Sequence, residues 1–365
     1  MLTSILVFIA GLVVLVVGAE LLVRGAARRA ALLGISPLVI GLTIVAFGTS
    51  SPELAVSVKS ALAGQADISI GNVVGSNIFN IVFILGASAL IRPIKIAQQL
   101  VRLDAPIMVG VSILAFVLAL DGSLNRLDGV ILFTLLITYV VFLIRKSKSE
   151  GAEVENEYAE EFASKEQPGA ASIVKNLMFT AVGLGLLVFG SDLLVESAVT
   201  IAATLGVSEL VIGLTIVAAG TSMPEEANSI VAAYKGEGDI AAGNVVGSNI
   251  FNVLGVLGVA GIVAPQSIAI ADHVLVFDLP VAIFAALITV PVFFVGNTVS
   301  RSDAVLFLTY FFAYNAYVVM RAMNNPAVDT YQTAMMIYNP ATYLWLVFIA
   351  WRHHQKTKSA GAAGS

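Results

Sequence analysis

Residues Gly41–Asn80 read GLTIVAFGTSSPELAVSVKSALAGQADISIGNVVGSNIFN, and residues Gly213–Asn252 read GLTIVAAGTSMPEEANSIVAAYKGEGDIAAGNVVGSNIFN. The second stretch follows the first at a constant offset of 172 residues, and 27 of the 40 aligned positions are identical. Each copy carries one glutamate, Glu53 or Glu225, inside a largely apolar run. A carboxylate in such a run is costly and indicates a functional site. The repeat therefore predicts two related halves around a shared cation site.

Composition places the chain in the membrane class. Of its 365 residues 58% are apolar and only 12% are charged, whereas a soluble domain carries roughly 25% charged residues. Runs of about 20 apolar residues, the length needed to cross a bilayer, recur throughout. The chain has no cysteine and only three histidines, which excludes disulfides, thiolate metal sites and a histidine-based cluster. No cofactor is expected.

Eleven apolar spans are predicted. They cover residues 2–24, 37–63, 68–91, 103–121, 127–145, 172–200, 208–234, 240–263, 274–297, 303–321 and 333–351. The predicted organisation is a first repeat at 1–145, an acidic linker at 146–172, a second repeat at 173–322 and an additional helix with its tail at 323–365. We therefore predict an all-α polytopic membrane protein with two five-helix repeats, a core of ten transmembrane helices and an eleventh helix outside it.

Basic residues predict the orientation of these spans. Loops after odd-numbered spans, together with the C-terminal tail, hold 16 of the 19 lysines and arginines, and the other side holds only Lys59, Arg126 and Arg321. The positive-inside rule then places the acidic linker in the cytoplasm and the N-terminus outside. Because five spans per repeat is an odd number, the repeats would insert in opposite orientations, which is the inverted-repeat architecture of secondary transporters.

The motif Gly-Thr-Ser-x-Pro-Glu ends at Glu53 in the first copy and at Glu225 in the second. Proline inside a helix removes a backbone hydrogen bond and clashes with the carbonyl four residues back, so the helix should open near Gly48 and Gly220. Such backbone at membrane depth must be satisfied by a cavity, water or an ion. Carbonyls beside a carboxylate form the all-oxygen site that Ca²⁺ prefers. Further candidate oxygens belong to Ala46, Thr49, Ser50, Ala218, Thr221 and Ser222.

The motif Gly-Asn-Val-Val-Gly-Ser-Asn-Ile-Phe-Asn closes each copy. Its two glycines are four residues apart, a spacing that lets two helices approach closely. Ser76 and Asn80 are also four apart and share one face of a helix, which we expect to point at the glutamate-bearing helix. The second copy repeats this pair. The remaining asparagines are expected to cap a helix, bridge helices or hold the break: Asn72, Asn77, Asn244 and Asn249.

Charge balance favours a divalent cation. Two glutamates match one Ca²⁺ or two Na⁺, so the site is expected to hold cations or protons at all times. Glu20 and Asp192 also match at the repeat offset, and Arg24 lies one turn from Glu20, so an interfacial or interhelical ion pair explains them as well as a role in transport does. The acidic linker lacks EF-hand spacing and indicates a solvated connection.

These motifs resemble the two repeats of the cation/calcium exchanger superfamily, and are closest to its prokaryotic sodium/calcium exchangers. The resemblance spans roughly residues 1–320 and implies an antiporter that exchanges Ca²⁺ for Na⁺ by alternating access across a prokaryotic plasma membrane. It implies Ca²⁺ ligands at Glu53, Glu225, Thr49 and Thr221. It also implies flanking sodium-site groups at Ala46, Ser50, Ser76, Asn80, Ala218, Ser222, Ser248 and Asn252.

Two departures from the family pattern keep a second function open. Asn252 stands where sodium/calcium members often carry aspartate, and Glu226 stands where the first copy has Leu54. Glu226 lies about 100° around a helix from Glu225, where it would line a vestibule or contact a residue such as Asn228. A Ca²⁺/H⁺ antiporter of the same fold is therefore the alternative. A cation channel fits less well, because channels build pores from several subunits or a ring of carbonyls.

Overall fold

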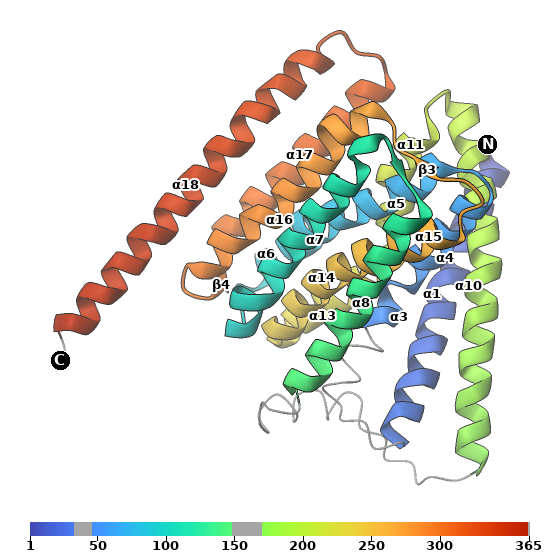
Figure 1. Ribbon diagram of the computed structural model, residues 1–365, viewed down its shortest axis with the longest axis horizontal. Coiled ribbons are helices and arrows are strands. Elements are labelled where there is room, and N and C mark those ends of the chain that lie inside the picture. The colour runs from blue at the N-terminus through green and yellow to red at the C-terminus, as the bar shows by residue number, and fades with distance from the viewer. Residues whose placement is uncertain (33–45, 148–169, 364–365) are drawn as a thin grey trace. The chain divides into compact units, whose positions relative to one another are not determined.

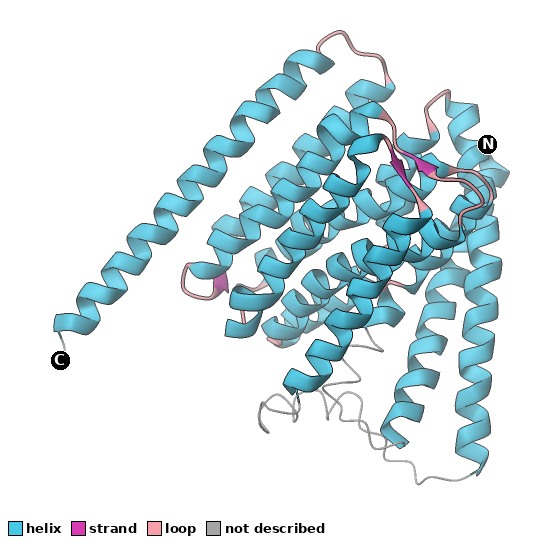
Figure 2. Ribbon diagram, in the orientation of Figure 1, coloured by secondary structure: helices cyan, strands magenta, loops and turns pink. Residues whose placement is uncertain are grey.

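The computed structural model describes residues 1–32, 46–147 and 170–363, and these residues are almost entirely helical (Figures 1 and 2). The acidic linker predicted at 146–172 lies largely outside the described residues, as does the beginning of the span predicted at 37–63. The predicted all-α membrane class is confirmed. Two short pairs of strands interrupt the helices.

The first half of the chain begins with a long helix and continues through shorter ones. Its elements are α1 (Leu2–Leu32), α3 (Ala46–Thr49), α4 (Ser51–Leu62), α5 (Ala66–Ile78), the π-helix η2 (Phe79–Leu85), α6 (Gly86–Ile91), β1 (Ile94–Lys95), the π-helix η3 (Leu100–Asp104), α7 (Ala105–Leu118), the 3₁₀-helix η4 (Ala119–Asp121), β2 (Ser123–Leu124) and α8 (Arg126–Ser147).

The second half follows the same order of elements. It contains α10 (Ala170–Leu205), α11 (Glu209–Ile212), the π-helix η5 (Gly213–Val217), α12 (Ala218–Thr221), α13 (Met223–Lys235), α14 (Gly238–Phe251), the π-helix η6 (Asn252–Leu257), α15 (Gly258–Val263), β3 (Ile268–Ala269), the π-helix η7 (Val274–Asp278), α16 (Leu279–Phe294), β4 (Thr298–Val299), α17 (Arg301–Ala322) and the additional helix α18 (Val328–Ala363).

Nine helices in the described part of the chain are long and apolar enough to cross a membrane. The two predicted spans that are missing from this set contain the Gly-Thr-Ser-x-Pro-Glu motifs. The span predicted at 208–234 is divided into α11, η5, α12 and α13, and only α3 and α4 are described for the span at 37–63. The prediction of eleven spans is therefore not reproduced as eleven continuous helices, because the motif breaks the helix in each copy.

The described chain forms two compact units, and each contains segments of both repeats. Unit 1 comprises Met1–Ser76, Ser123–Pro224 and Phe251–Ile270, and unit 2 comprises Asn77–Gly122, Glu225–Ile250 and Ala271–Ser365. Within unit 1, β2 pairs antiparallel with β3, and within unit 2, β1 pairs antiparallel with β4. Each strand pair joins one half of the sequence to the other.

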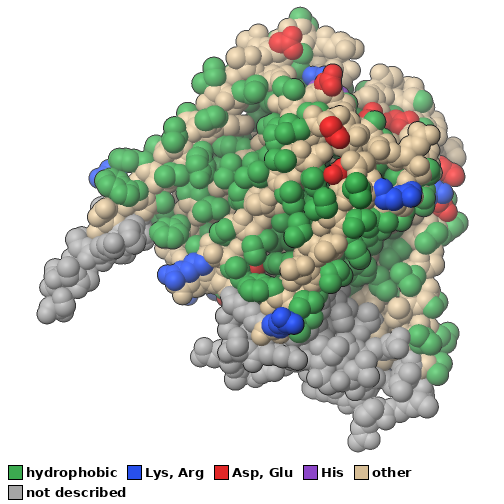
Figure 3. Space-filling view, in the orientation of Figure 1, with side chains coloured by type: hydrophobic (Ala, Val, Ile, Leu, Met, Phe, Trp, Pro, Cys, Tyr) green, Lys and Arg blue, Asp and Glu red, His purple; other side chains and the backbone are tan. Residues whose placement is uncertain are grey.

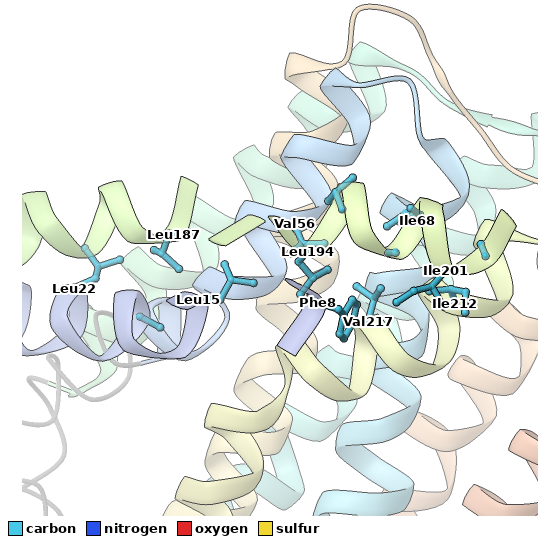
Figure 4. Close-up of a cluster of buried hydrophobic side chains, with 14 residues drawn as sticks. Phe8, Leu15, Leu22, Val56, Ile68, Leu187, Leu194, Ile201, Ile212 and Val217 are labelled. Atoms are coloured by element: carbon cyan, nitrogen blue, oxygen red, sulfur yellow. The ribbon is translucent and has the colours of Figure 1, made fainter. Parts of the chain in front are cut away.

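In unit 1, α1 and α10 pack along much of their length (Figure 1). Glycines permit the close approach: a methyl group on Gly18 would lie 3.0 Å from the Gly183 carbonyl oxygen, and one on Gly190 would lie 3.0 Å from that of Gly11. Such contacts between small residues are the usual way in which membrane helices associate. Side chains of both helices, such as Leu15 of α1, join a buried hydrophobic cluster (Figure 4). The other members of this cluster belong to α4, α5, α11 and η5.

In unit 2, α7 packs on α16, and α17 packs on α6 and η2. The additional helix α18 contacts α16 and α17, beside which it lies in Figure 1. Where α17 meets η7, the Tyr314 hydroxyl donates a 2.9 Å hydrogen bond to the buried carboxylate of Asp278. Hydrophobic side chains cover much of the face drawn in Figure 3, as expected for a surface in contact with lipid.

Candidate functional site

Both Gly-Thr-Ser-x-Pro-Glu motifs interrupt their helices at the serine. Ser50 separates α3 from α4, and Ser222 separates α12 from α13. Both serines have φ −82° and ψ 7°, outside the α-helical range. The proline lies at the start of the next helix, where its missing N–H is tolerated. The helix break predicted from proline is thus confirmed, and its backbone geometry is the same in both copies.

In the first copy, a side chain supplies a hydrogen bond to one of the backbone carbonyls near the helix break. The Ser51 hydroxyl donates a 2.5 Å hydrogen bond to the Gly48 carbonyl, which is the carbonyl expected to lose its partner because of Pro52. The second copy has Met223 in place of Ser51. Met223 is half exposed, whereas Ser51 is buried. The backbone break is therefore common to both copies, but this side-chain bond is specific to the first.

Glu53 lies in the first turn of α4 and is completely buried. The Ser222 hydroxyl donates a 2.8 Å hydrogen bond to its Oε1 atom, so the carboxylate of the first copy is held by the break of the second. Its Oε2 atom has no hydrogen-bond partner among the described residues. The Ser76 and Thr221 hydroxyls lie beside the same carboxylate. Glu53 is therefore surrounded by hydroxyl oxygens and has one carboxylate oxygen available for a cation.

Glu225 occupies the equivalent first turn of α13 and is also completely buried. The Ser248 hydroxyl on α14 donates a 3.2 Å hydrogen bond to its Oε1 atom. Two of the serines predicted as site residues, Ser222 and Ser248, thus each contact a glutamate. Thr49, Ser50, Asn252 and the others with described side chains are buried as well. Ala46 begins α3, but its side chain lies outside the described residues.

The glycines of the first Gly-Asn-Val-Val-Gly-Ser-Asn motif pack closely, as predicted. A methyl group on Gly71 would lie 3.0 Å from the Gly213 carbonyl carbon, and one on Gly75 would lie 2.5 Å from the Leu214 carbonyl oxygen. These glycines therefore face η5 and the start of α12. Backbone atoms of η5 come so near that only glycine fits there. At the next residue, the Ser76 hydroxyl donates a 3.4 Å hydrogen bond to the Ala218 carbonyl. The polar face that follows the glycines points at the glutamates, as predicted, because Ser76 lies beside the Glu53 carboxylate and Ser248 donates to Glu225.

The asparagine that follows the first glycine of each motif anchors the backbone of the glutamate. Asn72 Nδ2 donates to the Glu53 carbonyl at 3.1 Å and to Ser57 Oγ at 2.9 Å. Asn244 Nδ2 donates to the Glu225 carbonyl at 3.1 Å and to its own copy's serine, Ser229, at 3.0 Å. Ser57 and Ser229 were not predicted as site residues, although each lies four residues after its glutamate and is identical in both copies.

Asn80 and Asn252, the predicted sodium-site amides, lie where the α-helix changes to a π-helix. Asn80 is the second residue of η2, and Asn252 is the first residue of η6. Single π-turns inside helices are frequent at functional sites. In unit 2, Asn80 Nδ2 approaches Asn249 Oδ1 at 3.5 Å and Asn77 Nδ2 donates to the Asn249 carbonyl at 3.4 Å. The asparagines of the two copies therefore bond to each other, as the bridging prediction anticipated.

Helix α1 lies over both breaks within unit 1. A methyl group on Gly48 would collide with the side chain of Val23, and one on Gly220 would lie 2.8 Å from Leu12 Cδ1. The first helix thus covers the broken segment of its own repeat and that of the other repeat. Because Leu12 and Val23 are 11 residues apart, the two covered points are about 16 Å apart along the helix.

Charged residues outside the motifs form ion pairs away from the glutamates. Glu20 pairs with Arg24 on α1, and Asp192 on α10 lies 2.5 Å from Lys59 on α4. These contacts are the interfacial and interhelical pairings that explain Glu20 and Asp192 without a role in ion binding. Glu226 is half-buried next to Glu225.

The chemistry available in each copy is that of hard oxygen donors. Among residues 1–32, 46–147 and 170–363, no three histidine, aspartate or glutamate side chains come together. The groups that lie beside the carboxylates are hydroxyls, and hard oxygen ligands of this kind suit Ca²⁺ and Na⁺ better than transition metals. The fold is that of an integral membrane protein with one buried glutamate and its oxygen-bearing neighbours after each helix break.

Comparison with known proteins identifies the family. The sequence profile of the family described as sodium/calcium exchanger protein matches residues 3–145 and 175–320. The chain is 42% identical over 265 residues to the putative antiporter CaxA of Alkalimonas amylolytica, covering 73% of this chain and 82% of that protein. It is 34% identical over 340 residues to the sodium/calcium exchanger MaX1 of Methanosarcina acetivorans, covering 85% and 96%.

A solved structure agrees with these sequence comparisons. The sodium-calcium exchanger NCX_Mj, soaked with Na⁺ and Sr²⁺, superposes with a TM-score of 0.58 and 31% sequence identity, over 85% of this chain and 97% of that chain. The present chain therefore belongs to the sodium/calcium exchanger family of membrane transport proteins. The predicted resemblance to the cation/calcium exchanger superfamily is confirmed.

Proposed function

We propose that the protein is a secondary active antiporter that moves Ca²⁺ against Na⁺, and that Glu53 and Glu225 bind the transported Ca²⁺. The observation that carries this proposal is the double occurrence of one arrangement. In each copy a fully buried glutamate follows a broken helix and accepts a hydrogen bond from a serine. Two buried carboxylates are compatible with a membrane only when their charge is compensated, and one Ca²⁺ or two Na⁺ compensates it.

The remaining predicted residues complete the proposed site. The carbonyls of Thr49 and Thr221 would join the two glutamates as Ca²⁺ ligands. The flanking groups would serve the Na⁺ ions: Ala46, Ser50, Ser76, Asn80, Ala218, Ser222, Ser248 and Asn252. Burial of those whose side chains are described supports this assignment, because buried hydroxyl and amide oxygens in an apolar protein need partners.

Alternating access would involve α1 and α10. The position of Leu12 and Val23 over the two breaks supports the proposal that movement of α1 along its axis uncovers one break while it covers the other. The glycine contacts between α1 and α10 favour joint movement of the two helices. Cross-links can trap the outward-facing and the inward-facing state of the protein. The yields of these cross-links should change when Ca²⁺ or Na⁺ is added, and unchanged yields would argue against this movement.

The charge distribution supports an orientation with the N-terminus outside and the acidic linker in the cytoplasm, in a prokaryotic plasma membrane. In that orientation an inward Na⁺ gradient would drive Ca²⁺ out of the cell. Exchange of Ca²⁺ for H⁺ is the second candidate. It is favoured by the amide of Asn252, in place of a carboxylate, and by the additional acid Glu226.

The experiment that separates the two candidates is ⁴⁵Ca²⁺ uptake into proteoliposomes that carry the full chain. We expect vesicles loaded with Na⁺ and diluted into Na⁺-free buffer to accumulate Ca²⁺ without a pH gradient. Uptake that depends only on a pH gradient would assign the protein to Ca²⁺/H⁺ exchange. Uptake that persists with neither gradient and saturates at equilibrium would indicate a channel.

A further inference from the structure

Asn72 uses every polar atom of its side chain. Its Nδ2 group donates both protons, one to the Glu53 carbonyl at 3.1 Å and one to Ser57 Oγ at 2.9 Å. Its Oδ1 atom accepts a hydrogen bond of 2.9 Å from the Thr221 hydroxyl. Asn72 is completely buried. An asparagine amide offers two donors and one acceptor oxygen, so this side chain is held in a single orientation.

The three bonds of Asn72 join three segments of unit 1. The residue itself belongs to α5, Glu53 and Ser57 belong to α4, and Thr221 is the last residue of α12. Asn72 therefore connects the carboxylate helix of the first copy to the residue that precedes the break of the second copy. The Thr221 hydroxyl also lies 3.1 Å from the Val217 carbonyl oxygen and 3.3 Å from that of Ala218. Because the hydroxyl has one proton, these two oxygens share it with Asn72 Oδ1, the nearest acceptor at 2.9 Å.

We propose that Asn72 is a positioning residue that fixes the Thr221 carbonyl relative to the Glu53 carboxylate, and that this fixed separation sets which divalent cation the protein transports. The inference rests on the proposed function, because it takes both groups as ligands. Ca²⁺ accepts oxygen ligands at about 2.3–2.6 Å and Mg²⁺ at about 2.0–2.1 Å, so cavity size and flexibility decide between cations. A rigid amide between two ligand-bearing segments restricts that flexibility.

The second copy supports a role in positioning. Asn244 repeats both donor bonds, to the Glu225 carbonyl and to Ser229, within 0.1 Å of the lengths in the first copy. Each serine in turn lies 3.4 Å from a carbonyl of the neighbouring helix, Ser69 in the first copy and Ala241 in the second. The pair α4 and α5 and the pair α13 and α14 have different surrounding side chains, yet both keep the same amide bonds. Packing alone does not require this. Control of the glutamate's position explains why both copies retain these bonds.

The test uses variants of the full chain in the proteoliposome assay. Asn72→Leu removes all three bonds with little change in volume, and Thr221→Val removes the hydroxyl but keeps the backbone carbonyl. Each should raise the apparent KM for Ca²⁺ about tenfold while kcat changes less, because a lost buried hydrogen bond shifts a binding equilibrium by roughly that factor. Each should also reduce the preference for Ca²⁺ over the larger Sr²⁺. Thr221→Ser, which restores the hydroxyl, should recover most of the affinity that Thr221→Val loses.

The double variant provides the decisive comparison. In Asn72→Leu, the additional change Thr221→Val should have little further effect on KM, because the bond between the two side chains is already gone. Independent, additive effects would overturn the proposal, as would a normal KM and normal selectivity in either single variant. If Asn72→Leu does not fold, Thr221→Val decides alone. Ser112→Ala, which removes a buried hydroxyl that donates to Met108 of its own helix, is the control and should keep its KM.

Glu53→Gln is included in the same assay to separate this inference from the proposed function. Loss of transport in Glu53→Gln together with normal KM values in Asn72→Leu and Thr221→Val would refute only the positioning role. Normal transport in Glu53→Gln would refute the proposed site itself.

Discussion

The two copies of the repeated sequence share the backbone of the helix break and the amide that anchors the glutamate backbone, but they differ in the serine that bonds the carboxylate. The backbone angles of Ser50 and Ser222 coincide, and the amide of Asn72 makes the same two donor bonds as its counterpart in the second copy. Glu53 accepts from Ser222 of the other copy, whereas Glu225 accepts from Ser248 of its own copy. This contrast separates the geometry that both copies share from the contacts that each half adds.

The first copy is braced by three contacts that the second copy cannot make. Ser51 bonds the Gly48 carbonyl, Ser69 Oγ bonds the Ser57 carbonyl at 3.0 Å, and Lys59 pairs with Asp192. The second copy has Met223, Ala241 and Val231 at the equivalent positions. The α4 helix of the first copy is therefore fastened at more points than α13 of the second. The halves are alike in the groups assigned to the ion and unlike in rigidity.

The largest expected effect comes from removing the charge of either glutamate. Glu53→Gln and Glu225→Gln should each reduce Ca²⁺ transport about 100-fold or more, because loss of one buried charged partner costs at least about 3 kcal/mol. The measurement is the initial rate of ⁴⁵Ca²⁺ uptake, with folding checked by gel filtration in detergent. A variant that folds and transports normally would exclude its half of the site.

Next in size is the loss of the serine that bonds each glutamate. Ser222→Ala should raise the apparent KM for Ca²⁺ about tenfold, since a hydrogen bond to a charged group contributes about 1.5–3 kcal/mol. Ser248→Ala should have the smaller effect, because its bond is 3.2 Å long compared with 2.8 Å for Ser222. Equal effects on KM, or the reverse order, would show that the two copies differ in a way that these bonds do not explain.

A smaller effect is expected at the position where the motifs themselves differ. Ser51→Ala leaves the buried Gly48 carbonyl without its hydroxyl donor and should lower the free energy of unfolding by about 1 kcal/mol. Met223→Ser gives the second copy the same hydroxyl and should raise the free energy of unfolding by a similar amount or less. Thermal unfolding of the detergent-solubilised protein measures both changes. Destabilisation by Met223→Ser would mean that the second break has no equivalent carbonyl to satisfy.

The smallest effect is expected for Lys59→Val, which gives the first copy the residue found in the second. Lys59 and Asp192 each have a side chain that is 38% exposed, so their ion pair contributes at most about 1 kcal/mol. Transport should change less than about fivefold. The variant should also respond less to added salt than the unmodified protein does. A loss of transport as large as that of Glu53→Gln would give Lys59 a direct role in the ion pathway.

Much of the fold could be predicted from the sequence because its signals are strong. Apolar runs of membrane-spanning length predicted the helices, and proline next to a buried glutamate predicted the breaks now seen at Ser50 and Ser222. The 172-residue offset predicted which residues are equivalent. These inferences need only local chemistry and length, and so one sequence was sufficient for them.

Other features depend on contacts that spacing does not encode. The spacing of Gly71 and Gly75 predicted a close helix contact but not its partner, which is the π-helix η5, whose position follows from tertiary packing. The π-turn that begins at Asn252 has no signature comparable to proline. The bond from Ser222 to Glu53 joins residues 169 positions apart, and the repeat offset indicates equivalent residues but not contacting ones.

The joint binding of one Ca²⁺ by the two copies, as proposed above, is tested best by direct binding. Isothermal titration of the purified full chain with Ca²⁺ in Na⁺-free buffer should give one tight site per chain. Either Glu53→Gln or Glu225→Gln should abolish that site completely. Two sites in the unmodified chain, each removed only by its own variant, would show that the copies bind ions independently and would contradict the account.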